Sequence, residues 1–404
     1  MIQNWKKNAA LFLTGQALSI FGSMLVQYAM LWHITLKTGS GSMMSVFILA
    51  GILPMFFISP FAGVWADRFN KKYIINAADA SIALVTLAIA LCFIAGMESI
   101  WLLLVCSGLR AVGQGIQTPA VGAFIPEITP EEHLSKVNGI NGGIQSFIMF
   151  TAPLLSGLLL TYTSITFIFF IDVVTAAAGI AIVFFFVKTG ARKVQTEAGG
   201  TGGVDYFHDL KKGFMYIKSH KFILRLIVIS TVFFIAVSPA AFLTAIQVTR
   251  NFGNDIWRLT AIEMTFSSGM MLGNILVGIW GGFKNRVYSM ALSCALMGIE
   301  AASLGLTRNF VLYSAVMGIM GFTMPLYNTP SMVMLQTRVE PEYMGRVLSV
   351  FSMISSLMMP AGMLIWGPMA DVVSIDHILV GTGAVIFALS PIFLVSKSLR
   401  AAGV

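Results

Sequence analysis

Five ionisable side chains lie inside long apolar stretches of the chain, where charge is costly. They are Asp79, Arg110, Asp172, Glu263 and Glu300. On insertion scales, a charged side chain at the centre of a membrane-spanning helix costs about 2.5–3.5 kcal/mol. Four carboxyls cannot all pair with one guanidinium, so the surplus acids need a proton or another partner. Because a carboxyl in a low-dielectric environment can load and release a proton, these residues predict a proton-handling site.

Depth within the apolar stretches separates the five residues. Arg110 lies near the middle of its stretch and Asp172 is the next deepest, while the other three lie within about two helical turns of a membrane face. Glu263 and Glu300 could instead reach the outer surface. Asp79 could cap the inner end of its helix or pair with a basic loop residue. Arg110 could serve only to hold helices together, whereas Asp172 has the weakest structural explanation.

Neutral polar residues within the apolar stretches extend the candidate proton and substrate path. We include Gln16, Gln27, Gln145 and Asn328 in it. Gln16 and Gln27 are eleven residues apart, which places them on the same face of a helix. Such a stripe either joins neighbouring helices by hydrogen bonds or lines a path through the membrane.

The composition identifies the class of protein that carries these residues. Of 404 residues, 57% are hydrophobic and 10% are charged, whereas soluble proteins carry roughly 25% charged residues. The formal charge is +8, but the bases are scattered between apolar blocks, which argues against nucleic-acid binding. The three cysteines are isolated, and nucleotide-binding, metal-binding and catalytic motifs are lacking. We expect an integral membrane protein with no enzymatic activity, cofactor, metal or nucleotide.

Twelve apolar stretches are long enough to span a membrane as helices, which need about 20 residues. They lie near 10–33, 44–66, 74–96, 100–121, 137–161, 165–187, 223–246, 259–281, 288–306, 310–334, 348–370 and 378–396. This predicts an all-α fold with a six-helix domain over 1–188 and another over 223–404. The linker 189–222 contains glycines and then Val204–Lys221, whose spacing is typical of an amphipathic helix on the membrane surface.

The distribution of basic residues predicts the orientation in the membrane. With the N-terminus inside, 20 of the 25 Lys and Arg residues fall on the inner side and 4 on the outer side, and Arg110 lies within a span. Short loops rich in Lys and Arg stay in the cytoplasm. Both termini are therefore predicted to be cytoplasmic.

The two halves of the sequence resemble each other in order and spacing. Thr118-Pro119 and Thr329-Pro330 are each followed eleven residues later by Pro-Glu, and Pro153 and Pro360 then lie within the next helices. Two pseudo-symmetric six-helix bundles are typical of transporters whose substrate path lies between the halves. The predicted points of helix bending are Gly113, Gly115, Pro153, Gly157 and Pro360, with tight helix packing as the alternative for the glycines.

The segment from Gly63 to Lys72 resembles the loop signature of the major facilitator superfamily, G-x-x-x-D-R-x-G-R-R/K. The matching positions are Gly63, Asp67, Arg68, Lys71 and Lys72; the segment departs from the signature at Asn70, where the family has Gly, and in having Lys71 for Arg. The resemblance implies that this loop acts as a latch for the outward-facing state. It also implies the major facilitator fold.

Two further motifs resemble those of drug/proton antiporters in this superfamily. Arg110 with Gly113 and Gly115 is similar to the helix-four motif, whose Arg is implicated in proton coupling. Ala152-Pro153 with Ser156-Gly157 is a degenerate form of the helix-five motif.

Along its whole length the chain is similar to the macrolide-efflux-like branch, as in Tyr343-Met344-Gly345-Arg346-Val347. The resemblance implies a monomer in the bacterial cell membrane, among lipid, that exports an amphiphilic drug in exchange for protons. Export of tetracycline or of a siderophore or metabolite, nutrient uptake, and a non-transporting sensor or scaffold are the alternatives.

Overall fold

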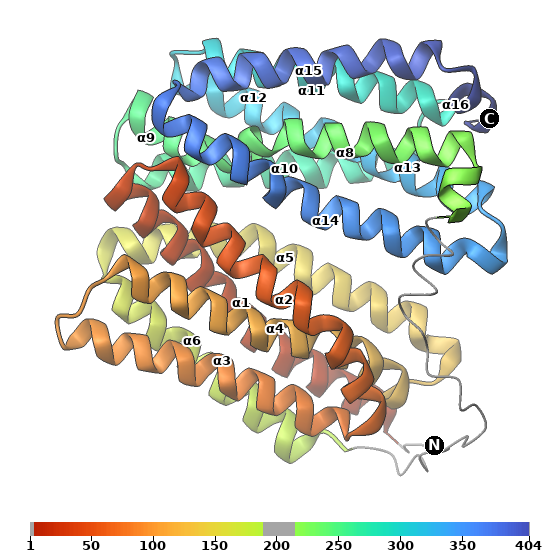
Figure 1. Ribbon diagram of the computed structural model, residues 1–404. Helices are drawn as coiled ribbons and strands as arrows, with labels where there is room; N and C mark the ends of the chain where they lie inside the picture. The colour runs from red at the N-terminus through yellow and green to blue at the C-terminus, as the bar shows by residue number, and fades with distance from the viewer. Residues whose placement is uncertain (1–3, 189–214, 404) are drawn as a thin grey trace. The chain divides into compact units, whose positions relative to one another are not determined.

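In a computed structural model, which describes residues 4–188 and 215–403, the chain forms helices with no strand among the described residues (Figure 1). The first half contains α1 (Trp5–Thr38), α2 (Gly41–Arg68), α3 (Lys71–Ile94), α4 (Ile100–Ile128), η1 (Glu131–His133), α5 (Leu134–Tyr162), α6 (Ile165–Ala181) and η2 (Ile182–Phe186). The second half contains α8 (Lys221–Phe242), α9 (Thr244–Phe252), α10 (Ile256–Trp280), α11 (Arg286–Leu306), α12 (Phe310–Thr323), α13 (Pro325–Arg338), α14 (Pro341–Val372), α15 (Ile375–Val395) and α16 (Lys397–Ala402).

The twelve spans predicted from the sequence are confirmed as helical segments that are long and apolar enough to cross a membrane. Four of them are composite. The fifth begins with the turn η1 and continues into α5. The sixth continues from α6 into the π-helical turn η2, the seventh joins α8 to α9, and the tenth joins α12 to α13. The break between α12 and α13 falls just before Pro325, which has no N–H to continue the helix ladder.

Most of the predicted linker, 189–214, lies outside the described residues, and so does most of the predicted amphipathic helix. Residues 215–219 are helical, with Tyr216 and Ile217 buried and Lys218 exposed. The Tyr216 ring stacks on Tyr343 of α14, with ring centroids 4.4 Å apart.

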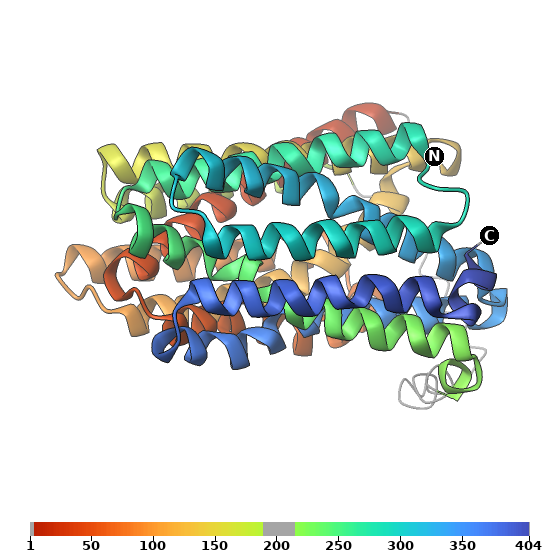
Figure 2. The same ribbon diagram turned by 90° about the horizontal axis from the view of Figure 1, so that it is seen from above.

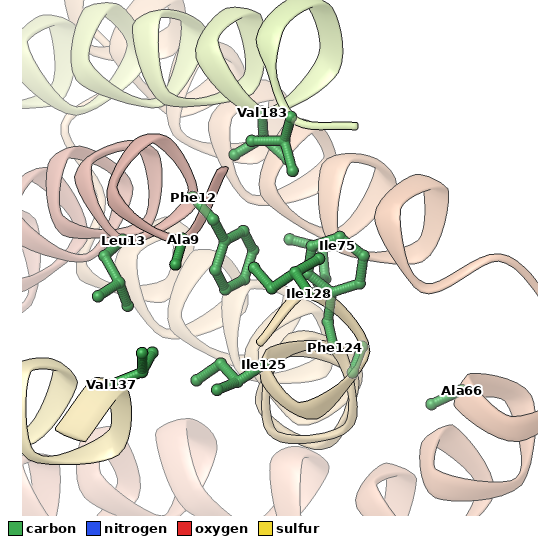
Figure 3. Packing of buried hydrophobic residues seen from close by; sticks show 12 residues of the cluster. Ala9, Phe12, Leu13, Ala66, Ile75, Phe124, Ile125, Ile128, Val137 and Val183 are labelled. Carbon is green, nitrogen blue, oxygen red and sulfur yellow. The ribbon is translucent and has the colours of Figure 1, made fainter. Parts of the chain in front are cut away.

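The chain divides into two compact units. One holds α1 to η2 apart from the start of α2, and the other holds α8 to α16 together with Gly39–Ser45. In the first unit, α1 packs against α5 and α6, and α3 packs against α4 and α6. The side chains of Phe12, Ile75, Phe124 and Ile128, from α1, α3 and α4, form part of a buried hydrophobic cluster in this unit (Figure 3).

Glycine allows α1 to approach α6 closely. A Cβ atom on Gly22 would lie 2.1 Å from Thr175 Oγ1 and 2.9 Å from Asp172 Oδ1. A Cβ on Gly179 would lie 2.5 Å from the carbonyl oxygen of Gly15. Small residues let helix backbones approach in a membrane, and here they bring the face of α6 that carries Asp172 against α1.

The second unit repeats the packing of the first. There α8 packs against α14 and α15, and α11 packs against α15, α12 and α13. Asn70 caps α3 by accepting a hydrogen bond from the N–H of Lys72, and Asn285 caps α11 by accepting one from the N–H of Val287. The repeat seen in the sequence is therefore present in the arrangement of helices within each unit.

Two glycines on α10 provide a test of close packing in the second unit. A Cβ on Gly269 would lie 1.9 Å from the carbonyl oxygen of Gly318, whereas Gly278 has no neighbouring atom within 4 Å of that position. Gly269→Ala is expected to destabilise the protein by about 1–3 kcal/mol through overpacking. Gly278→Ala is expected to be neutral or to stabilise it by about 0.5–1 kcal/mol, since Ala favours a helix over Gly.

Thermal unfolding of both variants in the same detergent compares the two positions. Equal midpoints for the two variants would contradict the close approach of α10 to α12.

Candidate functional site

An ion pair between Arg110 of α4 and Asp172 of α6 lies inside the first unit. Arg110 Nη1 is 2.5 Å from Asp172 Oδ2, and the side chains are 2% and 0% exposed. Among the ion pairs of the described residues, it is the only one whose two side chains are both this deeply buried. Because a guanidinium keeps its proton under all ordinary conditions, Asp172 supplies the negative charge that neutralises it.

Hydrogen bonds tie this pair to α1 and α3 as well. Thr86 Oγ1 donates to Asp172 Oδ2 at 2.9 Å, and Ser23 Oγ donates to Asp172 Oδ1 at 3.3 Å. Arg110 Nη2 donates to the carbonyl oxygen of Ser23 at 3.2 Å, and Arg110 Nη1 also contacts Thr86 Oγ1. We call Ser23, Thr86, Arg110 and Asp172 the ion-pair layer, since it joins four helices at one level.

A second buried polar cluster surrounds Asp79 of α3. Ser19 Oγ and Gln16 Nε2 donate to its carboxylate at 2.8 and 3.2 Å, and Gln117 Nε2 donates at 2.5 Å. Gln117 Nε2 also lies 3.3 Å from Gln16 Oε1. In the part of the chain that the structure describes, Asp79 forms no ion pair. We call Gln16, Ser19, Asp79 and Gln117 the Asp79 layer.

The spacing along the helices explains why these two layers lie above one another. Asp79 and Thr86 are seven residues apart on α3, and Arg110 and Gln117 are seven residues apart on α4. Seven residues are about two helical turns, or roughly 10 Å, on the same face. Because α3 and α4 are consecutive helices that run in opposite directions, each contributes one residue to each layer.

Sequence reasoning therefore found the charged members of the two layers but missed most of their neutral partners. Gln16 was predicted to belong to the path, and it does contact Asp79. Ser19, Ser23, Thr86 and Gln117 were not singled out. The seven-residue spacing from Asp79 and from Arg110 is the signal that would have found Thr86 and Gln117.

The alternatives considered for Asp79 are wrong. The cap of α3 is Asn70, and the hydrogen-bond partners of Asp79 come from α1 and α4. Arg110 is paired with Asp172, not with Asp79. The two layers together hold one guanidinium and two carboxyls, so they are electrically neutral when one of the two carboxyls carries a proton.

The two glutamates lie in the second unit. Glu300 of α11 is buried, so it does not reach the surface; its Oε1 accepts a hydrogen bond from Thr323 Oγ1 at 2.8 Å, and its Oε2 has no partner among the described residues. Glu263 of α10 is half-buried and forms no hydrogen bond or ion pair within the described ranges. Both remain candidates for proton binding.

The three other predicted path residues lie apart from the charged layers. Gln145 and Asn328 are exposed, and Gln27 is half-buried. Among the described residues no hydrogen bond is formed by their side chains. Their place in a substrate path stays a prediction.

The loop that resembles the family signature has an ordinary backbone at its variant position. Asn70 has φ −66°, so this position does not require Gly, and its side chain caps α3. Lys71 Nζ is 3.2 Å from Glu127 Oε2, and Lys72 Nζ donates to the carbonyl oxygen of Val187 at 2.7 Å. Arg68 is exposed. The side chain of Asp67 lies outside the description, and the latch stays a prediction.

The predicted bending points differ in what surrounds them. A Cβ on Gly113 would lie 2.5 Å from Ile82 Cγ1, and one on Gly115 would lie 2.2 Å from Ile58 Cγ2, so both glycines allow close packing of α4. In contrast, nothing lies within 4 Å of a Cβ on Gly63 of the loop signature, so close packing does not require a glycine there. Both α5 and α14 continue as helices through Pro153 and Pro360, and Gly157 is buried.

The corresponding positions of the second unit carry no charge. Counted from the helix caps Asn70 and Asn285, Asp79 corresponds to Cys294, and counted from Ser164 and Ser374, Asp172 corresponds to Thr382. The repeated pairs Thr118-Pro119 and Thr329-Pro330 align Arg110 with Gly321 and Gln117 with Asn328. Cys294, Gly321 and Thr382 are buried, whereas Asn328 is exposed. Tyr327 stacks on Phe233, with centroids 3.9 Å apart, and its hydroxyl lies 2.9 Å from Ser230 Oγ. The charged residues of the two layers are therefore not repeated at the aligned positions of the second unit.

Removing one partner of the buried ion pair should destabilise the protein more than removing both. Loss of a single partner costs about 3–5 kcal/mol, because an uncompensated charge remains buried. A carboxylate can relieve this by taking up a proton, but a guanidinium cannot lose one. We expect Asp172→Asn to be more destabilising than Arg110→Gln, and the double variant to lose less stability than the two single variants combined.

Thermal unfolding in detergent of the two single variants and the double variant measures this coupling. Lys71→Gln is the control, since its ion pair with Glu127 is partly exposed and should contribute at most about 1 kcal/mol. Strictly additive losses for Arg110 and Asp172 would show that the two side chains are not coupled.

Curated relatives resemble the chain over nearly its whole length. It is 27% identical over 390 residues to Macrolide efflux protein A of Streptococcus pyogenes, covering 96% of this chain and 95% of the relative. It is also 27% identical over 328 residues to Macrolide efflux protein A of Enterococcus faecalis, covering 80% of this chain and 100% of the relative.

Solved structures share the fold at low sequence identity. A D-xylose-proton symporter matches with a TM-score of 0.69 at 13% identity, covering 96% of this chain and 98% of the other. A bacterial homolog of the human lysosomal transporter Spinster matches with a TM-score of 0.65 at 14% identity, covering 100% and 98%. The sequence pattern of the Major Facilitator Superfamily matches residues 12–363. The chain therefore belongs to the Major Facilitator Superfamily.

Proposed function

We propose that this transporter exports a hydrophobic or amphiphilic, macrolide-like drug from the bacterial cell in exchange for protons, by alternating access. The efflux proteins of Streptococcus and Enterococcus support the substrate class. The excess of basic residues in alternate loops supports cytoplasmic termini. The observation that carries proton coupling is the presence of two carboxyls and one guanidinium in the buried layers of the first unit.

The charge of these layers links proton binding to conformation. In the arrangement described here, Asp172 is paired with Arg110 and Asp79 is held by neutral donors alone. A proton on Asp79 makes the two layers neutral. Loss of that proton leaves a second carboxylate roughly two helical turns from the single guanidinium, where a low dielectric strengthens their attraction. The two acids then compete for Arg110.

This competition gives a simple exchange cycle. A proton that enters from outside neutralises one acid, weakens its hold on Arg110 and favours the inward-facing state. Drug then binds from the cytoplasm or the inner leaflet, and the proton is released inside. Asn76, one turn before Asp79 on α3, is buried with both amide atoms unpartnered. Because such groups are usually satisfied by water, we place the proton path to Asp79 along this side of α3.

The alternative substrates differ in charge. Export of tetracycline or of a siderophore or metabolite, and uptake of a nutrient, use the same fold. An anionic substrate would need an available buried base, but Arg110 is already paired with Asp172. This favours a neutral or cationic amphiphile.

The substrate class can be found by expression in a pump-deficient bacterium. We expect the minimum inhibitory concentration to rise for a macrolide more than for tetracycline or a lipophilic cation, and an uncoupler to abolish the corresponding efflux from energised vesicles. Asp172→Asn and Arg110→Ala should each remove this resistance. Wild-type, uncoupler-sensitive transport in both variants would disprove the assignment of the ion pair, and a shift for another drug class alone would redirect the substrate.

Proton coupling can be measured directly with the drug that this panel identifies. Adding it to purified transporter in weakly buffered detergent solution with a pH dye should release protons, because drug and proton alternate in the cycle. Asp79→Asn fixes the neutral form, so we expect it to bind drug with little proton release and to lose proton-driven efflux. Glu132→Gln, which removes an exposed acid outside both layers, is the control. Proton release at the wild-type level from Asp79→Asn would exclude Asp79 as the carrier.

A further inference from the structure

A groove of about 1040 Å³ runs between α8 and α15 in the second unit. The two helices lie side by side, with α15 (dark blue) next to α8 (green) in both views (Figures 1 and 2). The apolar residues that line the groove are Leu224, Val228, Ile229, Val232, Leu389 and Ile392, and Pro391 and Val395 complete its wall. At one end, where α15 ends and α8 begins, the lining changes to Arg225, Ser396 and Lys397.

The apolar wall is open on its outer side. Val228 is 53% exposed and Ile392 is 48% exposed, and Leu224 and Val232 continue the exposed stripe along α8. In a membrane-spanning helix this surface faces hydrocarbon, so a lipid chain is the natural occupant. From Arg225 to Val232 the stripe is roughly 10 Å long, which is most of the ~15 Å that one leaflet contributes to the hydrocarbon core.

At the polar end of the groove, the positive charges have no counter-ion among the described residues. Arg225 Nη1 donates to Ser398 Oγ at 2.7 Å and to Ser396 Oγ at 3.2 Å, which orients the guanidinium. Neither Arg225 nor Lys397 forms an ion pair with any described residue. α8 contains no acidic residue, and Asp376, the only one in α15, lies at the opposite end of that helix.

Three other basic residues of this unit form ion pairs. Arg250, Arg258 and Arg308 pair with Asp371, Asp255 and Asp376, respectively. Arg225 and Lys397, which form no ion pair with a described residue, lie at the end of the groove that a hydrocarbon chain would fill. An oriented guanidinium, an ammonium and two hydroxyls form a recognisable set of groups for a phosphate.

We propose that this groove binds an anionic phospholipid of the inner leaflet, with its phosphate at Arg225 and Lys397 and an acyl chain between α8 and α15. Basic pockets between spanning helices on the cytoplasmic side are known to bind anionic head groups. The choice of the inner leaflet rests on the proposed cytoplasmic location of both termini. The binding itself depends on neither the drug nor the proton.

Native mass spectrometry of the delipidated full-length protein tests this site without a transport assay. Phosphatidylglycerol and phosphatidylcholine of equal chain length are added separately at equal concentration. The wild type should retain phosphatidylglycerol preferentially, and Arg225→Gln/Lys397→Gln should lose that preference. Lys136→Gln/Lys284→Gln removes two other exposed lysines from the side predicted to be cytoplasmic and should retain it.

A second variant tests the apolar part of the groove separately. Val228→Trp fills the groove without changing charge, and because this side chain is more than half exposed, folding should be preserved. We expect it to reduce retention of both lipids. The proposal is overturned if the wild type does not distinguish the two lipids, or if the Arg225/Lys397 double variant retains phosphatidylglycerol as the wild type does. Either result would leave the proposed drug efflux untouched, since no step of that cycle uses the groove.

Discussion

A charge that is removed from water must be neutralised at short range, and in this protein that constraint falls on Arg110. Its guanidinium cannot lose its proton, so an acid has to reach it within the helix bundle. Asp172 does so from α6, and Thr86 and Ser23 supply further hydrogen bonds from α3 and α1. Gly22 keeps α1 close to Asp172, where any larger side chain would collide with the acid. The relative positions of four helices thus depend on one ion pair.

Comparison of the two pseudo-symmetric units shows that the need to neutralise a buried arginine applies to the first unit and not to the aligned positions of the second. Both units have the same helix packing and equivalent helix caps, yet the second unit has Cys294, Gly321, Asn328 and Thr382 where the first has Asp79, Arg110, Gln117 and Asp172. An aromatic core stabilises the second unit by burial of apolar surface and ring stacking. Duplicated architecture therefore accommodates two different interiors. Among the described residues, two buried acids and one buried base lie in neighbouring layers of the first unit.

Elsewhere in the chain, the pairing of charged residues depends on how accessible they are to water. Lys71 pairs with Glu127 near the surface, and Arg308 pairs with Asp376 at a helix end, where water reduces the cost of separating them. Arg225 and Lys397 are exposed and have no acidic partner among the described residues, which suits the boundary between a membrane and the cytoplasm. The same amino-acid types thus form a deeply buried ion pair, partly exposed ion pairs and exposed cations at a helix end, according to their depth.

Much of this architecture is determined by the sequence alone, because a membrane requires long apolar helices and makes each misplaced charge conspicuous. The twelve spans, the internal repeat and the identity of Asp79, Arg110 and Asp172 as the residues to explain all follow from that requirement. The sequence did not determine which acid pairs with Arg110, since Asp79 and Asp172 are both compatible with helical periodicity. Nor did it single out Ser19 or Gln117, whose neutral side chains resemble many others in the spans. Only the tertiary structure decided these contacts, because they depend on how the faces of α1, α3, α4 and α6 are rotated against one another, and the close approaches at Gly22 and Gly113 set that rotation.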